Sequence, residues 1–331
     1  MGDKSGIEWT DATWNPVTGC SKVSAGCKYC YAERDFHRPY PGREFTEVRT
    51  HPGRLEQALG WKRPRKIFVN SMSDLFHDRV SDEFLAAVFG VMSTAAQHTF
   101  QVLTKRPERA RQFLRATSVE ACLAGLGRRS VDFTSRRQGE QAVAHTPSNE
   151  TWPLANVQLG VSVEDQETAD HRIPVLLQTP AAVRFVSYEP ALGPVDFSRY
   201  LLDGACPVCS TFSSIAKVWH GRPCPACGSE PYPVNRLDWV IAGGESGRDA
   251  RPPHPNWFRA TRDQCQAAGV AFFFKQWGEF APYAGDFTDL HLTSAHPAHR
   301  MVNGQLMERR GKKQAGRLLD GREWNEFPVA S

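Results

Sequence analysis

The stretch KIFVNSMSDLFHDRVSDEFLAAVFGVMSTAAQHTFQVLT, residues 66–104, holds a strand, a helix and a second strand in succession. The runs KIFVN (66–70) and FQVLT (100–104) are short and nearly continuous in apolar character. Such runs are typical of strands that are covered on both faces, as in a parallel sheet. The segment 81–97 between them is amphipathic, and Ser81 is a suitable N-cap before the acidic residues that follow. The stretch therefore predicts a β–α–β unit.

The same alternation continues along the chain. Further strand candidates of similar composition stand at 157–163, 183–188, 238–244 and 271–276. Helix candidates occupy 167–177 and 255–268, and Gly269 is a good C-cap for the second. With one more strand before Cys20, this gives about seven strands. The pattern predicts an α/β fold, built as a partial or full (β/α) barrel.

Two segments interrupt the alternation. Residues 118–152 are polar and rich in arginine, and we interpret them as an insertion loop. Residues 203–235 carry a cysteine cluster and are expected to form a small inserted module. The expected organisation is a barrel over 1–280 with these two insertions, followed by a C-terminal extension at 281–331.

The composition is that of a soluble globular protein, with 331 residues, 40% hydrophobic and 23% charged. No apolar run approaches the roughly 18 residues that would span a membrane, and the N-terminus lacks the apolar region of a secretory signal. A cytoplasmic location without membrane contact is expected. The net charge is +4, and arginine outnumbers lysine 30 to 10. This balance makes nucleic acid a candidate partner.

The module at 203–235 contains the pairs CPVC and CPAC, separated by fourteen residues. Two C-x2-C pairs at such a distance predict a tetrahedral zinc site. The alternatives are two disulfides, or His220 in place of one thiolate. The predicted zinc ligands are Cys206, Cys209, Cys224 and Cys227.

A different cluster lies near the N-terminus, in TGCSKVSAGCKYCYAE (18–33), where Cys20, Cys27 and Cys30 have the spacing C-x6-C-x2-C. A structural zinc would need a fourth ligand, such as His37 or His51. An iron–sulfur cube can instead be held by three thiolates, which leaves one iron open. The remaining cysteines, Cys122 and Cys265, stand alone and are expected to be ordinary buried thiols.

Polar residues follow the ends of the predicted strands. In a parallel barrel these positions converge on one face, where active sites are built. The polar groups include those of the SMSD segment at 71–74, KRP at 105–107, Ser162, Glu164, Asp165, Tyr188, Glu189, Glu245, Ser246, Lys275, Gln276 and Glu279.

These residues together resemble the radical S-adenosylmethionine (SAM) superfamily, which commonly carries C-x3-C-x-aromatic-C after the first barrel strand. Cys27, Tyr29 and Cys30 match the second half of that motif, whereas the first spacing is six residues and not three. The string WNPVTGC…GCKYCYAE is also similar to a phage- and prophage-associated, radical-SAM-like family named for its three cysteines. The segments SMSDLF, TKRPER, VSVEDQ, YEP, GGESG and KQWG extend this resemblance over residues 7–280.

The resemblance implies that Cys20, Cys27 and Cys30 hold a 4Fe–4S cluster whose open iron binds SAM. One electron, from a flavodoxin- or ferredoxin-type donor, would then yield a 5′-deoxyadenosyl radical. Tyr29 would lie against the adenine. The other implied cofactor contacts are Ser71, Ser73 and Asp74 for the methionyl amine, Ser162 and Glu164 for the ribose, and Gly243 and Glu245, with Ile241, on the adenine side. At the same expected face, the catalytic candidates are Glu189, Lys275 and Gln276.

Three functions are compatible with these features. The first is a radical SAM enzyme on nucleic acid, in DNA repair or base modification, which the basic balance, the two insertions and the phage association favour. The second is a radical SAM enzyme on a protein or small molecule. The third is a metal-stabilised nucleic-acid-binding protein without radical chemistry.

Overall fold

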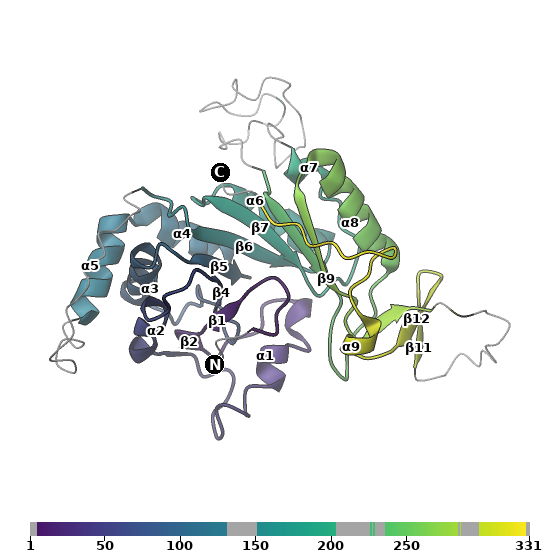
Figure 1. Ribbon diagram of the computed structural model, residues 1–331, viewed down its shortest axis with the longest axis horizontal. Coiled ribbons are helices and arrows are strands. Elements are labelled where there is room, and N and C mark those ends of the chain that lie inside the picture. Colours follow the sequence, from purple (N-terminus) through teal and green to yellow (C-terminus); the bar gives the residue numbers. More distant parts are fainter. Residues whose placement is uncertain are drawn as a thin grey trace. The chain divides into compact units, whose positions relative to one another are not determined.

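The computed structural model describes residues 5–130, 151–202, 236–283 and 298–328, with the single residues 226, 228 and 285. Seven strands form one sheet in the order β1-β4-β5-β6-β7-β8-β9 (Figure 1). The pairs with a defined register, including β1–β4 and β8–β9, are parallel. The strands are β1 (Ala12–Trp14), β4 (Lys66–Val69), β5 (Thr99–Thr104), β6 (Val157–Val163), β7 (Val183–Tyr188), β8 (Trp239–Gly243) and β9 (Ala271–Gln276).

The predicted α/β fold with about seven strands is therefore confirmed. Strands β6, β7 and β9 begin and end at the predicted residues, because their apolar runs are bounded by clear polar or turn residues. Within the described residues the strand order is open, with β1 and β9 at its two ends. The sequence predicted a partial or a full barrel. The described residues do not form a closed barrel.

Helices and two small sheets make up the other regular elements of the described residues. The α-helices are α1 (Tyr31–Arg34), α2 (Glu56–Leu59), α3 (Asp82–Thr94), α4 (Pro107–Ala116), α5 (Val119–Ser130), α6 (Gln166–Leu177), α7 (Ser198–Leu201), α8 (Pro255–Ala268) and α9 (Lys312–Ala315). Two 3₁₀ turns occupy Ala25–Cys27 and Pro52–Arg54. The small sheets pair β2 (Val17–Thr18) with β3 (Arg49–Thr50), and join β10 (Phe280–Pro282), β12 (Gln305–Arg309) and β11 (His299–Val302).

The chain forms two compact units, the first from residues 1–23, 32–161 and 178–184, and the second from 24–31, 162–177 and 185–331. In the first unit, α3 begins as predicted, because the Ser81 side chain accepts a hydrogen bond from the backbone N–H of Phe84. Residues Phe84 to Ser93 of this helix are all buried. It is therefore a core helix of the first unit.

Helix α5 corrects the sequence prediction, which placed an insertion loop over 118–152. The helix packs against α3, and Figure 1 shows the two side by side. The contact is close because a Cβ on Gly125 would lie 2.7 Å from the Cβ of Ala86. Cys122 is fully buried on this helix. The apolar residues on one face of this segment therefore pack against α3. Residues 131–150 lie outside the described part of the chain.

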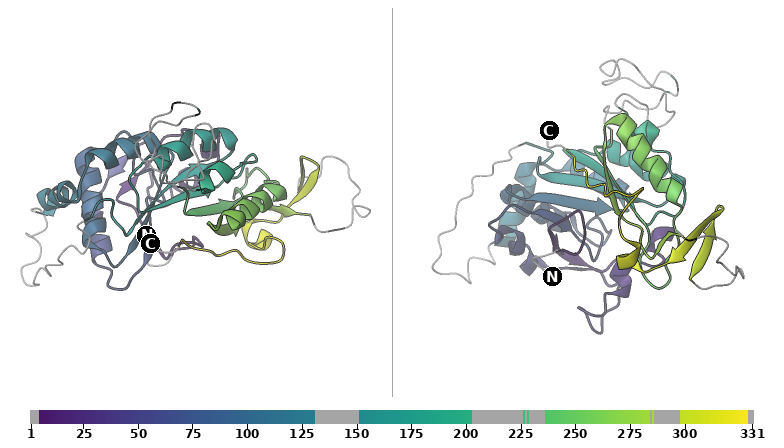
Figure 2. Two further views of the ribbon diagram at one scale, coloured as in Figure 1. Left: turned by 90° about the horizontal axis from the view of Figure 1, so that it is seen from above. Right: turned by 45° about the vertical axis from the view of Figure 1, so that its right-hand side comes forward.

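In the second unit, α8 packs beside β9 (Figure 2), with the rings of Phe258 and Phe274 5.0 Å apart. The helix ends at Gly269 as predicted, with φ of 63°. The C-terminal segment belongs to the same unit, because the carbonyl of Trp324 accepts from the Phe274 N–H at 3.0 Å. The predicted boundary between residues 280 and 281 falls inside β10.

The four cysteines of the predicted zinc module lie outside the described residues. Across the helices that the structure does describe, none has the length and apolar character needed to cross a membrane.

Candidate functional site

Cys20 is held in the first unit by a tightly packed backbone. It follows β2 directly, and its N–H donates to the Phe45 carbonyl at 2.9 Å. The preceding Gly19 has φ of +86°, and a Cβ there would lie 2.4 Å from the carbonyl oxygen of Glu47. Only glycine fits this position without moving the backbone. The turn that presents Cys20 is therefore defined by its neighbours and not by its own sequence alone.

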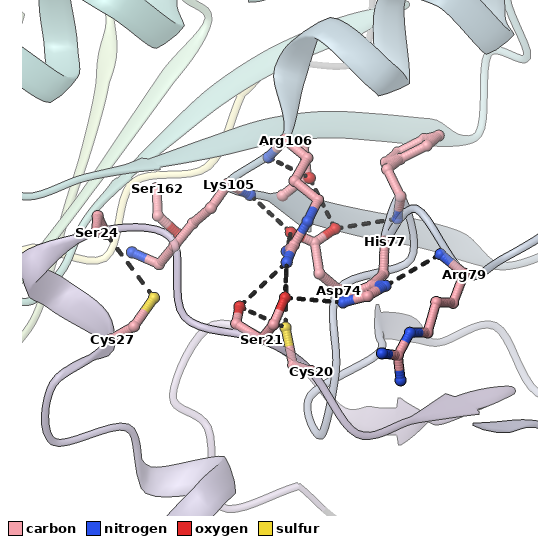
Figure 3. A network of polar contacts seen from close by, with 12 residues as sticks. Cys20, Ser21, Ser24, Cys27, Asp74, His77, Arg79, Lys105, Arg106 and Ser162 are labelled. Carbon is pink, nitrogen blue, oxygen red and sulfur yellow. Dashed lines mark hydrogen bonds and ion pairs between the residues drawn. The ribbon is translucent and has the colours of Figure 1, made fainter. Parts of the chain in front are cut away.

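The side chain of Arg106 reaches this turn from the end of β5 (Figure 3). Its Nη1 donates to Cys20 Sγ at 3.6 Å and to Asp74 Oδ2 at 3.1 Å. Its Nη2 donates to the carbonyl of Ser21 at 3.1 Å and to the Ser21 hydroxyl at 2.9 Å. Burial alone would lower the pKa of Arg106, but the charges of Asp74 and Cys20 raise it above its usual value. The guanidinium therefore stays charged.

Asp74 fixes the position of Arg106. It comes after β4, is 6% exposed, and accepts four hydrogen bonds. The donors are the Thr104 hydroxyl at 2.8 Å, the Lys105 N–H at 2.9 Å, the Phe76 N–H at 3.0 Å and Arg106 Nη1. A carboxylate satisfied in this way is a rigid anchor for the arginine.

His77 completes the polar network of the first unit in Figure 3. Its Nδ1 accepts the backbone N–H of Arg79 at 3.2 Å, so the ring proton belongs on Nε2. Nε2 lies 2.9 Å from the Ser21 hydroxyl and donates to it. Burial lowers the pKa of His77, which keeps this neutral tautomer in place.

The predicted SAM contacts of the SMSD segment lie near Cys20, but their polar atoms are hydrogen-bonded within the first unit. The Ser71 hydroxyl accepts from Asn15 Nδ2 at 3.1 Å and donates to Asn15 Oδ1 at 3.2 Å. Ser73 donates to the Val17 carbonyl at 2.9 Å. Ser71 and Ser73 attach the segment to Asn15 and to β2, and Asp74 attaches it to the end of β5. Their predicted role toward the methionyl amine stays a prediction.

His51, a candidate fourth ligand for zinc, lies in the same unit. Its Nε2 is 2.8 Å from the Thr18 hydroxyl, which also accepts from Arg43 Nη1 at 3.3 Å. Burial and the charges of Arg54, Arg43 and Arg49 lower the pKa of His51 to about 4. His51 Nε2, which would have to bind zinc, is therefore hydrogen-bonded to Thr18 in this structure.

Cys27 and Cys30 belong to the second unit, on the segment 24–31. The 3₁₀ turn Ala25–Cys27 is closed by the Cys27 N–H, which donates to the Ser24 carbonyl at 3.0 Å. The Ser24 hydroxyl donates to Glu164 Oε1 at 2.9 Å and lies 3.8 Å from Cys27 Sγ. A Cβ on Gly26 would lie 2.4 Å from the same Glu164 oxygen. The turn therefore rests directly on the Glu164 carboxylate.

Glu164 is fully buried and is paired with Arg172 on α6. Arg172 Nη1 donates to Glu164 Oε2 at 3.0 Å and to the Ser162 carbonyl at 2.7 Å. The sequence predicted that Ser162 and Glu164 contact a ribose. In the second unit, the Glu164 carboxylate and the Ser162 carbonyl take part in a buried ion-pair network at the end of β6. Their predicted role toward the ribose stays a prediction.

Arg251 holds the other side of the segment 24–31. Its Nε and Nη2 donate to the two carboxylate oxygens of Glu245 at 2.8 and 2.6 Å. Its Nη1 donates to the Ala25 carbonyl at 3.1 Å, and its guanidinium lies 5.3 Å from the centre of the Tyr29 ring. The hydrogen bonds to Glu245 raise the pKa of Arg251. The arginine joins Glu245 to the segment that carries Cys27 and Cys30.

The three predicted catalytic residues do come together in the second unit. Lys275 Nζ lies 2.9 and 2.8 Å from the two Glu189 oxygens, and Gln276 Nε2 donates to Glu189 Oε1 at 3.1 Å. Gln276 also donates to the Ser246 hydroxyl at 3.1 Å. A Cβ on Gly243 would approach the Glu189 carboxyl carbon to 3.3 Å. The ends of β7, β8 and β9 thus form one polar cluster.

The sequence analysis gave no specific role to the three arginines that connect these groups. Arg106 stands in the KRP segment after β5, so its place at a strand end was a usable signal. Arg172 lies within α6, and Arg251 lies in a loop, so neither has a recognisable pattern. Over the described residues, no three His, Cys, Asp or Glu side chains are grouped closely enough to hold a metal ion.

Comparison with known proteins gives one match. No curated protein and no solved structure matches the chain. A family model described as "Protein of unknown function (DUF5131)" matches residues 4–328, which is nearly the whole sequence. The chain therefore belongs to the DUF5131 family.

Proposed function

We propose that this protein is an iron–sulfur enzyme of the radical SAM type that acts on nucleic acid. The observation that carries the proposal is the contrast among its cysteines. Cys20, Cys27 and Cys30 are partly exposed, whereas Cys122 and Cys265 are buried. Burial raises the pKa of the latter two thiols, which keeps them protonated and unsuited to bind metal. The three accessible cysteines are the ones that the radical SAM resemblance assigns to the cluster.

The donor set fits the proposed group, because thiolates are the preferred ligands of iron–sulfur clusters. Cys20, Cys27 and Cys30 would hold a 4Fe–4S cluster. With SAM bound, this group supplies the electron that cleaves the sulfonium and yields the 5′-deoxyadenosyl radical. The residues of the chain position the cysteines that would hold this group. Arg106 and Asp74 hold the turn of Cys20, and Glu164 and Arg251 hold the turn of Cys27.

A nucleic-acid substrate is supported by the net charge of +4 and by the excess of arginine, which binds phosphate in a bidentate manner. The proposed zinc module at 203–235 would add a further contact surface. DNA repair or base modification is the corresponding activity. A flavodoxin- or ferredoxin-type protein would supply the electron.

A second candidate is a metal-stabilised nucleic-acid-binding protein without radical chemistry. It is favoured because the residues predicted to contact SAM make hydrogen bonds to other residues of the chain. The polar atoms of Ser73, Asp74, Glu164 and Glu245 all make hydrogen bonds inside the chain. Under this reading the same residues stabilise the fold, and the metal is zinc alone.

Anaerobic purification with metal analysis separates the two candidates. The radical SAM proposal expects about four irons per chain, together with zinc in the cysteine module. After reduction with dithionite in the presence of SAM, 5′-deoxyadenosine should accumulate. A colourless protein that contains only zinc and forms no 5′-deoxyadenosine would favour the second candidate.

Two variants test the ligand assignment. Cys30→Ala should lose iron and the associated visible absorption, because it removes one of three thiolates. Cys122→Ala is the matched control, since this thiol is buried between helices, and it should keep its iron. Full iron in the Cys30 variant, or equal loss in both, would contradict the assignment.

A further inference from the structure

Arg106 makes a contact that a purely structural arginine does not need. Its Nη2 supports the turn, through the carbonyl and the hydroxyl of Ser21 at 3.1 and 2.9 Å. Its Nη1 additionally donates to the sulfur of Cys20 at 3.6 Å. Nη2 therefore contacts only Ser21, whereas Nη1 contacts both Asp74 and a proposed cluster ligand (Figure 3).

The hydrogen bond from Arg106 Nη1 to the Cys20 sulfur involves a buried side chain that Asp74 holds in place. The side chains of Arg106 and Asp74 are only 10% and 7% exposed. Asp74 Oδ2 holds the same Nη1 atom at 3.1 Å, and the carboxylate is itself anchored by Thr104 and Lys105. Weak solvent screening strengthens a hydrogen bond at such a position. The donor is thus directed at the sulfur before any cluster is present.

We propose that Arg106 raises the reduction potential of the iron–sulfur cluster through this hydrogen bond to Cys20 Sγ; the inference rests on the proposed function. The reduced cluster carries one more negative charge than the oxidised one. A donor aimed at a ligand sulfur stabilises the reduced form more, which makes the potential less negative. Because Asp74 offsets the net charge of the guanidinium, the directional N–H to sulfur contact is the larger part of the effect.

Three variants separate this tuning from support of the turn. Arg106→Gln removes the donor to Cys20, while Asp74 keeps hydrogen bonds from Thr104, Lys105 and Phe76. Arg106→Lys keeps a charge beside Asp74 on a shorter side chain that withdraws from the sulfur, and it serves if the glutamine variant does not fold. Ser21→Ala is the control, because it removes a contact of Nη2 and leaves Nη1 in place.

The measurement is an anaerobic redox titration of each reconstituted protein, with iron content determined on the same samples. Both Arg106 variants should hold as much iron as the wild type and have a more negative midpoint potential. Ser21→Ala should keep the wild-type potential. Melting temperatures, recorded in parallel, show which variants are folded.

Several results would overturn the inference. An unchanged potential in cluster-loaded Arg106 variants would show that the contact has no electronic effect. An equal shift in Ser21→Ala would assign the effect to the geometry of the turn. Loss of iron from both Arg106 variants would mean that the arginine builds the site and does not tune it. A wild-type protein that takes up no iron would instead reject the proposed function, and the inference with it.

Discussion

Cys20 in the first unit and Cys27 in the second are supported in different ways, although a carboxylate–arginine pair stands beside each. In the first unit, Arg106 donates directly to the sulfur of Cys20. In the second, Arg251 donates to the carbonyl of Ala25, and Glu164 accepts from the Ser24 hydroxyl. Arg106 therefore contacts the cysteine sulfur itself, whereas Arg251 and Glu164 contact the residues of the turn that carries Cys27.

The two carboxylates also differ in their surroundings. Asp74 accepts two backbone N–H groups in addition to its arginine, so part of its stabilisation comes from the main chain. Glu164 is fully buried and is paired with Arg172 and Ser24, which are side-chain donors. The comparison indicates that the second support depends more on particular side chains. It should therefore be the easier one to break by mutation.

The largest expected effect is that of Arg172→Met, which leaves the Glu164 charge buried without its ion partner. Loss of one partner from a buried pair typically costs about 3–5 kcal/mol of unfolding free energy. Arg106→Met should cost less, because the backbone donors to Asp74 remain. Urea unfolding of both variants measures the difference. An equal or reversed order would contradict the comparison, and the double variant Glu164→Gln/Arg172→Met should recover part of the loss.

The next effect concerns the glycines that precede the cysteines. Gly19→Ala places a Cβ 2.4 Å from the Glu47 carbonyl oxygen, at φ of +86°. Left-handed strain and overpacking together should cost about 2–4 kcal/mol. Gly42→Ala is the matched control, because φ is +74° there but no atom lies within 4 Å of the added Cβ. It should cost only about 1 kcal/mol. Equal melting temperatures for the two variants would show that the Gly19 turn is not tightly packed.

Gly26→Ala carries the same test into the second unit. The added Cβ would meet Glu164 Oε1, a side-chain atom that Arg172 holds in place. The variant should destabilise the turn of Cys27 and lower the iron content of the reconstituted protein. Normal iron content would show that the Glu164 carboxylate can move aside.

Most of the sheet could be predicted from sequence, because a buried parallel strand is a short apolar run with clear ends. Strand β9 and helix α8 with its Gly269 cap are examples, since hydrophobic pattern and turn residues agree there. Helix α5 was missed because its apolar residues were grouped with the polar, arginine-rich residues that follow them. The close approach of Gly125 to Ala86 is a tertiary contact, and no local sequence pattern predicts it.

The candidate site was predictable in part. The cysteines and the residues after the strands were found by spacing and position, and Glu189, Lys275 and Gln276 do form one cluster. The arginines that pair with Glu164 and Glu245 could not be chosen from sequence. Arginine is abundant in this chain, and its long side chain reaches partners far from its own position. Only the three-dimensional structure selects Arg172 or Arg251 from thirty arginines.

A smaller effect is expected from pH, and it should originate mainly in the first unit. The pKa of His51 is lowered to about 4, below its value in an unfolded chain. The unfolded state therefore binds more protons between about pH 6.5 and 4. Stability is fully present above this range and is lost as the pH falls through it. With allowance for solvent screening, the loss should be about 1–2 kcal/mol.

The pH effect is measured by urea unfolding at several pH values, with His51→Gln as the comparison. The variant should lose part of the slope of stability against pH in this range. An unchanged slope would mean that His51 does not titrate as its contacts with Thr18 and the nearby arginines imply.

The smallest effect should come from the ion pair between Lys22 and Glu33, which brackets the segment 24–31 in sequence. The two charges are 2.8 Å apart, but their side chains are 51% and 35% exposed. An exposed pair of this kind contributes about 0–0.5 kcal/mol, because water and salt screen it. Glu33→Gln should therefore leave both the melting temperature and the iron content close to those of the wild type. Gly26→Ala changes a neighbouring position by one methyl group and should lower both. If Glu33→Gln loses as much iron as Gly26→Ala, the segment is positioned by its exposed ends and not by the buried Glu164 carboxylate beneath it.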